Sequence, residues 1–335
     1  MTNNRKRLIY SNVLLFILSA WLIASCAVFA INPLTIDGTI KTDDARGVAI
    51  AGNYAYVADW KNGIKIIDIA NPHAPKLIST VKTNAARGII VTELYAYVAD
   101  MGAGLKIINI SNPKKPKIVS SLQIGGYAMS VAVAGDIAYV ADGDGGLKAI
   151  NIVNPENPYV IGSLSTKRAV EVRVSGIYAY VADDTEGLKI IDISDPTDLV
   201  LVGSLMTYEA LTVAVDGNYA YVGDVDHGLK VINTSNPRVP VLIGSVMIGT
   251  VDCVRIVGDY AYAINGNRLS IVDISDPFSS VRVESIEIGR AKAVSVSGDY
   301  AYIACGQDGL KTVKTNSLER KAMLGTREPT PNLGE

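Results

Sequence analysis

Histidine and cysteine are scarce in this chain of 335 residues, which contains two histidines and three cysteines. The histidines, His73 and His227, fall in loop segments that the strand pattern described below places on opposite faces of the fold. A metal centre built on imidazoles and a Ser-His-Asp triad both need a histidine beside other reactive groups. The sequence therefore excludes a His-based metal cluster and a triad of this kind.

An excess of positive charge is also missing. The formal net charge is −2, and residues 1–25 contribute Arg5, Lys6 and Arg7 but no acid, so the remainder carries −5. Nucleic-acid-binding proteins display basic stripes, so we expect no nucleic-acid partner. Hydrophobic residues make up 49% of the chain and charged residues only 19%, as expected for strands buried on both faces.

Between residues 45 and 315, apolar residues do not show the i, i+3, i+4 spacing that is typical of helices. One sequence motif recurs there seven times instead. It begins as Tyr54–Asp59, continues as Gly63–Ile69 and turns through Asn71-Pro72. The period is 40 to 42 residues, which is typical of solenoids, helical arrays and propellers. Each unit opens on a small residue, and these are Ala45, Ala86, Ala128, Ala169, Ala210, Val251 and Ala291.

Each unit contains four short runs in which apolar residues alternate with a period of two, the pattern of strands. In the first unit they are Gly47–Ala51, Tyr54–Asp59, Gly63–Ile69 and Lys76–Lys82, here termed strands a, b, c and d. The a and b strands are joined by the tight-turn dipeptide Gly52-Asn53. Four antiparallel strands at this period predict the blades of a β-propeller. A parallel β-helix is the alternative, but its coils are shorter and need no hairpin in each unit.

The ends of the repeat region indicate how the ring closes. Residues 34–42 resemble the d strand at 75–83, yet they precede the first a strand and have no unit of their own. We therefore expect them to complete blade seven, with residues 319–325 as the alternative. An open ring would leave an unpaired sheet edge. The predicted fold is an all-β, seven-bladed propeller over residues 33–316, closed by this N-terminal strand.

The phrases GLKIINISNP (104–113) and GLKIIDISDP (187–196), each preceded by Y-A-Y-V-A-D, resemble the LVIVD-repeat family of bacterial and archaeal surface proteins. The resemblance covers residues 45–315 and recurs in register in all seven units. It implies a seven-bladed propeller that is usually exported, and it brings no set of catalytic residues. The Gly-His and Trp-Asp pairs of WD repeats are missing.

Residues 1–30 read as an export signal, because the basic Arg5–Arg7 precedes an apolar run from Val13 to Ala24. Ile23-Ala24-Ser25-Cys26 resembles a bacterial lipobox, which implies lipidation of Cys26. The alternatives are cleavage after Ala30, or an uncleaved anchor over Leu8–Ala30. All three place the propeller outside the cytoplasm, held at the membrane or cell surface or, as second choice, secreted. Residues 317–335 are expected to form a flexible tail.

The two remaining cysteines are Cys253, at the start of strand a in blade six, and Cys305, at the end of strand b in blade seven. These positions make them neighbours in adjacent blades. A disulfide would require a Cα separation below about 7 Å. We expect two unpaired, partly buried thiols, with a disulfide as the alternative.

Candidate binding residues lie where strand a begins. At these positions the seven units carry different residue types, so the fold alone does not dictate them. Three cations come from blades one, two and seven, which are adjacent in a closed ring, and two acids face them. Such a group could hold a carboxylate, a phosphate or an acidic sugar. The alternative is that the cations pair with nearby aspartates or stay solvated. The five residues are Arg46, Arg87, Glu171, Asp252 and Lys292.

Five aspartates close strand b, at positions 59, 100, 142, 183 and 224. Such repetition indicates a structural role, in which Asp59, Asp100, Asp142, Asp183 and Asp224 accept N–H groups of the following loop and hold the b–c hairpin. A ring of catalytic or metal-binding carboxylates is the alternative. Asp142 and Asp144 stand two residues apart on a glycine-rich loop, a pattern that suggests calcium as the one candidate cofactor.

These observations favour a non-catalytic, extracytoplasmic binding or adhesion module that uses the face bearing the b–c and d–a loops. Its expected partner is a protein or a glycan, and it would contact the membrane through its N-terminal lipid or anchor. One alternative is an enzyme of the polysaccharide lyase or hydrolase type with its site at the channel mouth. Another is a structural component of a cell-envelope assembly.

Overall fold

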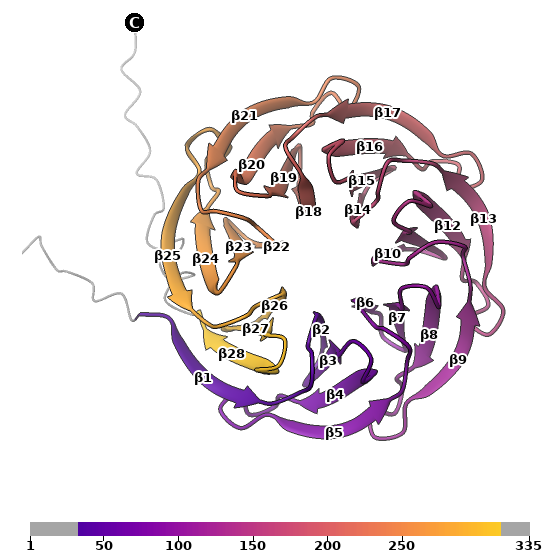
Figure 1. Cartoon of the computed structure of the whole chain (residues 1–335), viewed down its shortest axis with the longest axis vertical. Coiled ribbons are helices and arrows are strands. Elements are labelled where there is room, and N and C mark those ends of the chain that lie inside the picture. The colour runs from indigo at the N-terminus through magenta and orange to yellow at the C-terminus, as the bar shows by residue number, and fades with distance from the viewer. Residues whose placement is uncertain (1–32, 316–335) are drawn as a thin grey trace, which may run out of the picture. The chain divides into compact units, whose positions relative to one another are not determined.

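The computed structural model describes residues 33–315, which form seven four-stranded antiparallel sheets around a central channel. Figure 1 shows these sheets arranged in a ring. The only helical element in this range is the short 3-10 turn η1 (Pro277–Ser279). The predicted all-β, seven-bladed propeller is therefore confirmed. Within the described residues, no helix is long and apolar enough to cross a membrane. The predictions for residues 1–30, for Cys26 and for residues 317–335 lie outside the described range.

The first two strands of each blade lie nearest the channel and correspond to the predicted strands a and b. The innermost strands are β2 (Gly47–Ala51), β6 (Gly88–Val91), β10 (Ser130–Ala134), β14 (Glu171–Ser175), β18 (Ala210–Asp216), β22 (Cys253–Val257) and β26 (Ala293–Ser297). The second strands are β3 (Tyr54–Ala58), β7 (Tyr95–Ala99), β11 (Ile137–Ala141), β15 (Tyr178–Ala182), β19 (Tyr219–Asp224), β23 (Tyr260–Asn265) and β27 (Tyr300–Ala304).

The third and fourth strands continue each sheet outward to the rim (Figure 1). The third strands are β4 (Ile64–Asp68), β8 (Leu105–Asn109), β12 (Leu147–Asn151), β16 (Leu188–Asp192), β20 (Gly228–Asn233), β24 (Arg268–Asp273) and β28 (Leu310–Lys314). The outer strands are β5 (Lys76–Val81), β9 (Lys117–Leu122), β13 (Tyr159–Leu164), β17 (Val200–Leu205), β21 (Val241–Val246), β25 (Val281–Glu287) and β1 (Thr35–Ile40).

The core lies between the blades, and the alternation of side chains along each strand builds it. In β3, Ala55 and Val57 belong to an apolar cluster shared with blade seven, whereas Tyr56 and Ala58 belong to one shared with blade two. Successive side chains of a strand point to opposite faces of its sheet, so one strand seals two interfaces. This explains why both alternating sets are apolar and why the fraction of charged residues is low.

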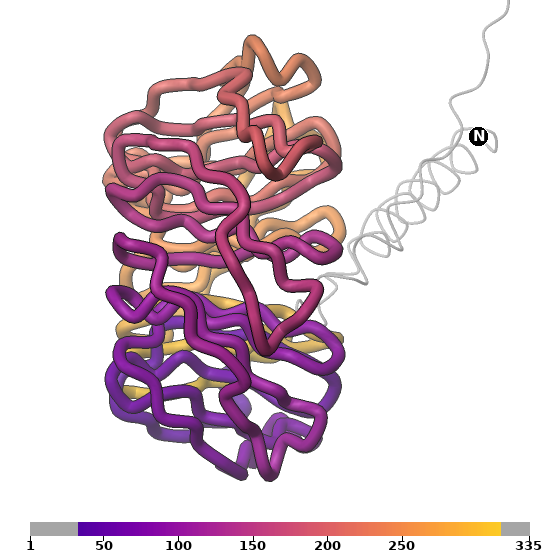
Figure 2. Tube along the Cα trace, turned by 90° about the vertical axis from the view of Figure 1, so that its right-hand side faces the viewer, coloured from indigo at the N-terminus to yellow at the C-terminus, as the bar shows by residue number. Residues whose placement is uncertain are grey.

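Blade seven is completed by a strand from the other end of the repeat region, as predicted. β1 pairs antiparallel with β28, and Thr39 lies opposite Lys311. Figure 2 shows the two chain segments, indigo and yellow, in the same part of the ring. A second link is a bridge between Ala45 and Gly306, in which each backbone amide donates to the other residue's carbonyl at 2.9–3.0 Å. The ring is thus joined both at its rim and near its channel.

In five outer strands (β1, β5, β13, β17 and β21), the residue after a bulge lies beside the proline carbonyl of the neighbouring blade's c–d turn. At Ser79 the hydroxyl donates to the Pro113 carbonyl at 2.6 Å. At Gly203 the same place is so tight that a Cβ would overlap the Pro237 carbonyl oxygen. At Gly244 the corresponding Cβ would lie 3.7 Å from the Pro277 carbonyl oxygen, an ordinary contact. The repeat therefore tolerates a side chain at this position in some blades only.

Gly203→Ala is expected to destabilise the ring by about 1–3 kcal/mol, because the added methyl forces β17 away from the next blade. Gly244→Ala is the matched control and is expected to leave stability within about 0.5 kcal/mol of wild type. Urea unfolding of the two variants checks this difference. Equal midpoints for the two would show that the close approach at Gly203 has no energetic consequence.

Candidate functional site

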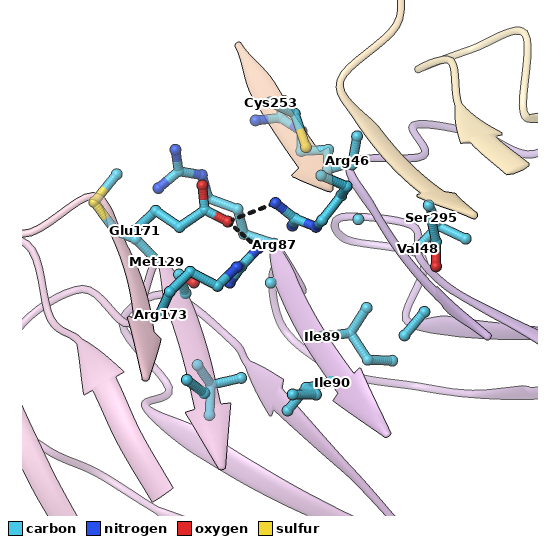
Figure 3. A pocket seen from close by; sticks show the side chains of 18 of the residues that line it. Arg46, Val48, Arg87, Ile89, Ile90, Met129, Glu171, Arg173, Cys253 and Ser295 are labelled. Carbon is cyan, nitrogen blue, oxygen red and sulfur yellow. Dashed lines mark hydrogen bonds and ion pairs between the residues drawn. The ribbon is translucent and has the colours of Figure 1, made fainter. Parts of the chain in front are cut away.

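The central channel contains a cavity of about 430 Å³ that is lined by the inner strands of all seven blades. All five residues predicted to form a channel-mouth site line it, namely Arg46, Arg87, Glu171, Asp252 and Lys292. Two further arginines, Arg173 and Arg255, also line it and were not predicted. Figure 3 shows the labelled side chains of Arg46, Arg87, Glu171 and Arg173 converging on one region of this channel.

Among the charged groups of the channel, Glu171 has the most ion-pair and hydrogen-bond partners. Its carboxylate pairs with the guanidinium groups of Arg173 and of Arg255, the latter at 3.1 Å. It also accepts the hydroxyl of Thr212 and, at 3.2 Å, the amide of Val213. Burial acts to raise the pKa of Glu171, but the two arginines and these donors hold it below its ordinary value. Glu171 is therefore an ionised counterion at the junction of blades four, five and six.

Arg173 and Arg255 occupy the third position of strand a, where the other blades have small or apolar residues. Those residues are Ala49, Ile90, Ala132, Ala214 and Ser295. An arginine in the middle of an inner, otherwise apolar strand was the signal that could have identified this pair. Each also donates to a backbone carbonyl of its own strand, Arg173 to Val172 and Arg255 to Val254.

At the channel mouth, Arg46 contacts residues of blade one and of the d–a connection that leads into blade one. Its Nε and Nη2 donate to the Asp44 carboxylate at 3.1 and 2.9 Å. Its guanidinium lies 3.8 Å from the centre of the Trp60 ring, a cation–π contact. Arg46 therefore pairs with an aspartate of the d–a connection and not with Asp59, which closes strand b of the same blade.

Asp252 and Lys292 lie at the start of the inner strands in blades six and seven. The Asp252 carboxylate accepts the amide of Gly266 at 3.3 Å. Burial raises the pKa of Asp252, while Lys292 and the Gly266 amide act to lower it. No carboxylate within the described residues lies close enough to the exposed Lys292 ammonium to form an ion pair. Lys292 thus remains at the opening as a solvated cation.

The aspartates that close strand b stabilise a different loop from the one predicted. Asp59 accepts the amides of Asp43 and Asp44 at 3.2 and 2.7 Å, and both belong to the d–a connection that enters the same blade. Asp100, Asp183 and Asp224 accept the equivalent amides in their own blades. The b–c hairpin is held by main-chain bonds instead, such as the Asp59 amide to the Gly63 carbonyl at 2.8 Å. The structural role is as predicted, but the loop is not.

Asp142 is the exception among these aspartates. The connection that enters blade three has one residue more than its neighbours, so the Tyr127 amide donates to the main-chain carbonyl of Asp142 rather than to its carboxylate. Both carboxylate oxygens are buried, and no donor meets them with hydrogen-bonding geometry. Burial raises the pKa of Asp142 to about 6, against the opposing influence of Lys148 and the Gly126 amide.

A carboxyl group whose pKa is raised in the folded state favours folding at low pH and disfavours it above that pKa. The contribution of Asp142 to stability is thus present below about pH 4 and is lost as the pH rises through about 6. We expect Asp142→Asn to stabilise the protein at pH 7.5 by about 1–3 kcal/mol. The two unfolding midpoints should converge near pH 4.

Asp100→Asn is the matched control for this prediction. The Asp100 carboxylate accepts two backbone amides at 3.0 and 2.7 Å and lies 3.5 Å from the Lys106 ammonium. Its substitution should therefore destabilise the protein at pH 7.5 by about 1–3 kcal/mol. Thermal unfolding followed by circular dichroism between pH 4 and pH 8 measures both variants. Changes of the same sign at pH 7.5 would contradict this account.

The described residues contain no group of three or more histidine, cysteine, aspartate or glutamate side chains arranged to hold a metal. Asp142 is buried while Asp144 is exposed, so the two residues proposed for calcium lie in different environments. Cys253 and Cys305 are both unpaired, as predicted, and both are buried rather than partly buried. Burial raises the pKa of Cys305 to about 12, so its thiol stays protonated.

The face that bears the d–a and b–c loops also exposes aromatic side chains. Tyr127 and Tyr208, in d–a loops, are 60% and 62% exposed. The Tyr208 ring lies 4.7 Å from that of His227, which comes from a b–c loop. Trp60, from another b–c loop, covers Arg46. Charged and aromatic groups therefore meet at the same end of the channel.

Comparison with solved structures supports the architecture alone. The crystal structure of the computationally designed Ika8 protein matches with a TM-score of 0.63 and 11% sequence identity, over 84% of this chain and 99% of that one. Significant matches extend to 1458 solved chains, so the likeness identifies a widespread fold and no activity. A comparison with curated proteins gave no significant match.

A family model gives a more specific result. The LVIVD repeat matches this sequence seven times, at residues 43–83, 85–123, 125–166, 168–207, 209–248, 248–287 and 288–313. These matches coincide with the seven blades and cover most of the chain. The protein therefore belongs to the LVIVD-repeat family.

Proposed function

We propose that this protein is a non-catalytic, extracytoplasmic binding module that holds a protein or glycan ligand on the loop face around the channel opening. The observation that supports the proposal most strongly is the distribution of repeated and unrepeated residues. The repeated ones pack the blades together, while the charged residues in and just before strand a, which differ between blades, line one cavity of about 430 Å³. Unrepeated charged groups on a repeated scaffold are typical of a binding surface.

The exposed aromatic groups of the loop face support the same proposal. Tyrosine rings supply large contact areas at low entropic cost and stack on sugar rings or on apolar side chains. Tyr127 and Tyr208 stand on the loops that lead into the inner strands β10 and β18, next to the charged lining. A ligand seated over the opening would contact both kinds of group.

Export and attachment to the membrane through Cys26 remain part of the proposal, supported by the basic and apolar pattern of residues 1–30. Metabolic labelling with a radioactive or alkyne-bearing fatty acid tests it in a bacterial host. Label should enter the wild-type chain and be absent from Cys26→Ser. Equal labelling of both chains, or of neither, would remove lipidation at this residue from the proposal.

Arrays of immobilised glycans and peptides, probed with the labelled full-length protein, test the binding role. The loop-face variant Tyr127→Ala/Tyr208→Ala is expected to lose binding by tenfold or more. Phe278→Ala is the matched control, since Phe278 is 65% exposed but lies in a c–d turn on the opposite face. Equal loss in the two variants would exclude the loop face, and turnover of a polysaccharide probe would favour an enzyme.

A further inference from the structure

Arg87 differs from every other charged group that lines the channel. It stands immediately before β6, and its main-chain amide donates to the Ala99 carbonyl at 2.9 Å. Its Nη1 atom is buried and has no hydrogen-bond partner. A buried donor without a partner costs free energy, so native proteins rarely leave one unless a ligand or ion meets it.

The neighbouring charges do not satisfy this guanidinium. Glu171 is engaged by Arg173 and Arg255, and Arg46 is engaged by Asp44. Glu171 acts on Arg87 across the channel without forming an ion pair with it, while Arg46 adds repulsion. Burial lowers the pKa of Arg87, and this repulsion adds to the effect. Glu171, the acid that acts on Arg87, is thus already paired with Arg173 and Arg255.

The channel as a whole is positive, although the protein is acidic. Its lining contains five cationic side chains, Arg46, Arg87, Arg173, Arg255 and Lys292, and two acidic ones, Glu171 and Asp252. The excess of three positive charges is enclosed by low-dielectric blades, where fields are screened less than in water. An anion entering from the loop face would be attracted toward Arg87.

We propose that Arg87 anchors an oxyanion site in the channel, which binds a carboxylate or a phosphate group of the ligand. The site rests on the proposed binding function and specifies its chemistry. A guanidinium presents planar donors that match two oxygens of either group, and charge-assisted bonds of this kind are the strong ones. Arg46 and Lys292 add attraction at the rim, and Glu171 keeps Arg173 and Arg255 from taking the anion.

The test is titration of the full-length protein by isothermal calorimetry, with inorganic phosphate in one arm and acetate in the other, at ionic strength fixed with chloride. The wild-type protein should bind at least one of these anions above the chloride background. Arg87→Gln should weaken that binding at least tenfold. Arg282→Gln is the matched control, because Arg282 is exposed on the outer strand β25 and carries the same charge.

Arg87→Gln has a second expected effect that separates lost binding from lost folding. Because Arg87 leaves a buried donor unpaired, its replacement should not lower the unfolding midpoint in chloride alone. A folded Arg87→Gln protein that binds the anions as well as wild type would overturn the proposal, and so would wild-type protein that binds neither. Preference for phosphate or acetate identifies which group the ligand carries.

Combined with the array experiment, the titration distinguishes a failure of the oxyanion site from a failure of the loop-face binding role. Anion binding lost in Arg87→Gln, together with no ligand on the arrays, would support the oxyanion site and count against the loop-face binding role. Array binding that persists in Arg87→Gln would support the loop face and overturn the oxyanion site.

Discussion

Glu171→Gln is expected to destabilise the ring by about 2–4 kcal/mol, because it leaves two partly buried arginines side by side with no counterion. Glu171 contacts both guanidinium groups and, through Thr212, the strand of the next blade. The Thr212 hydroxyl in turn accepts the amide of Val254 in blade six. One carboxylate thus connects three consecutive blades at the channel. Chemical denaturation at neutral pH measures the loss.

The control for this prediction replaces the whole charged group by the residues that blade three has at the same places. Glu171→Ser/Arg173→Ala/Arg255→Ala imitates Ser130 and Ala132 and leaves no buried charge unpaired. Replacing a complete buried ion pair by smaller neutral residues is often neutral, whereas removing one partner is not. We expect the triple variant to unfold closer to wild type than the single variant does. A single variant as stable as wild type would show that Glu171 is dispensable.

Deleting residues 33–44 is expected to lower stability by more than about 5 kcal/mol and to make the protein prone to aggregation. The deletion removes β1, so the edge of β28 loses its partner strand. It also removes the buried Leu34 and uncovers Leu310 and Val313, which are completely buried in the closed ring. A burial loss of about 1.5–3 kcal/mol for each large side chain gives the expected size.

The matched control is a chain that ends at residue 315, because β28 ends at Lys314. It should keep the wild-type midpoint, whereas the chain without residues 33–44 should unfold many degrees lower. Differential scanning calorimetry distinguishes the two truncations. If the C-terminal truncation had the larger effect, residues 319–325 and not β1 would be closing the ring.

The fold was predictable because the same pattern of four strands occurs in each of the seven repeats. The predicted strands of the first unit agree with β2, β3, β4 and β5 to within one residue at every end. Closure by β1 was predictable because residues 34–42 resemble an outer strand that has no blade of its own. Small errors in single copies matter little when the same alternation is repeated, since all copies must satisfy the same packing.

The site was less predictable because it depends on departures from the repeat. The five predicted residues do line one cavity, but Arg173 and Arg255 were missed because only the first positions of strand a were compared. The aspartates were assigned to the loop that follows them in sequence, whereas antiparallel pairing brings the preceding d–a connection to their side chains. The Asp142 carboxylate lacks a partner because the connection before blade three has one extra residue. The 42-residue spacing from Ala86 to Ala128 shows that a residue is inserted, but not that the insertion removes a hydrogen bond.

The most direct test of the account is to observe the Arg87 guanidinium itself while an anion is added. In a 15N-labelled protein, the Nε–Hε resonance of Arg87 can be assigned by its disappearance in Arg87→Gln. We predict that this resonance shifts in a saturable way with phosphate or acetate at constant ionic strength, while that of Arg282 does not move. Resonances of Arg87 and Arg282 that respond equally, or no response at Arg87 to either anion, would contradict the claim that the channel of this propeller is an anion-binding site.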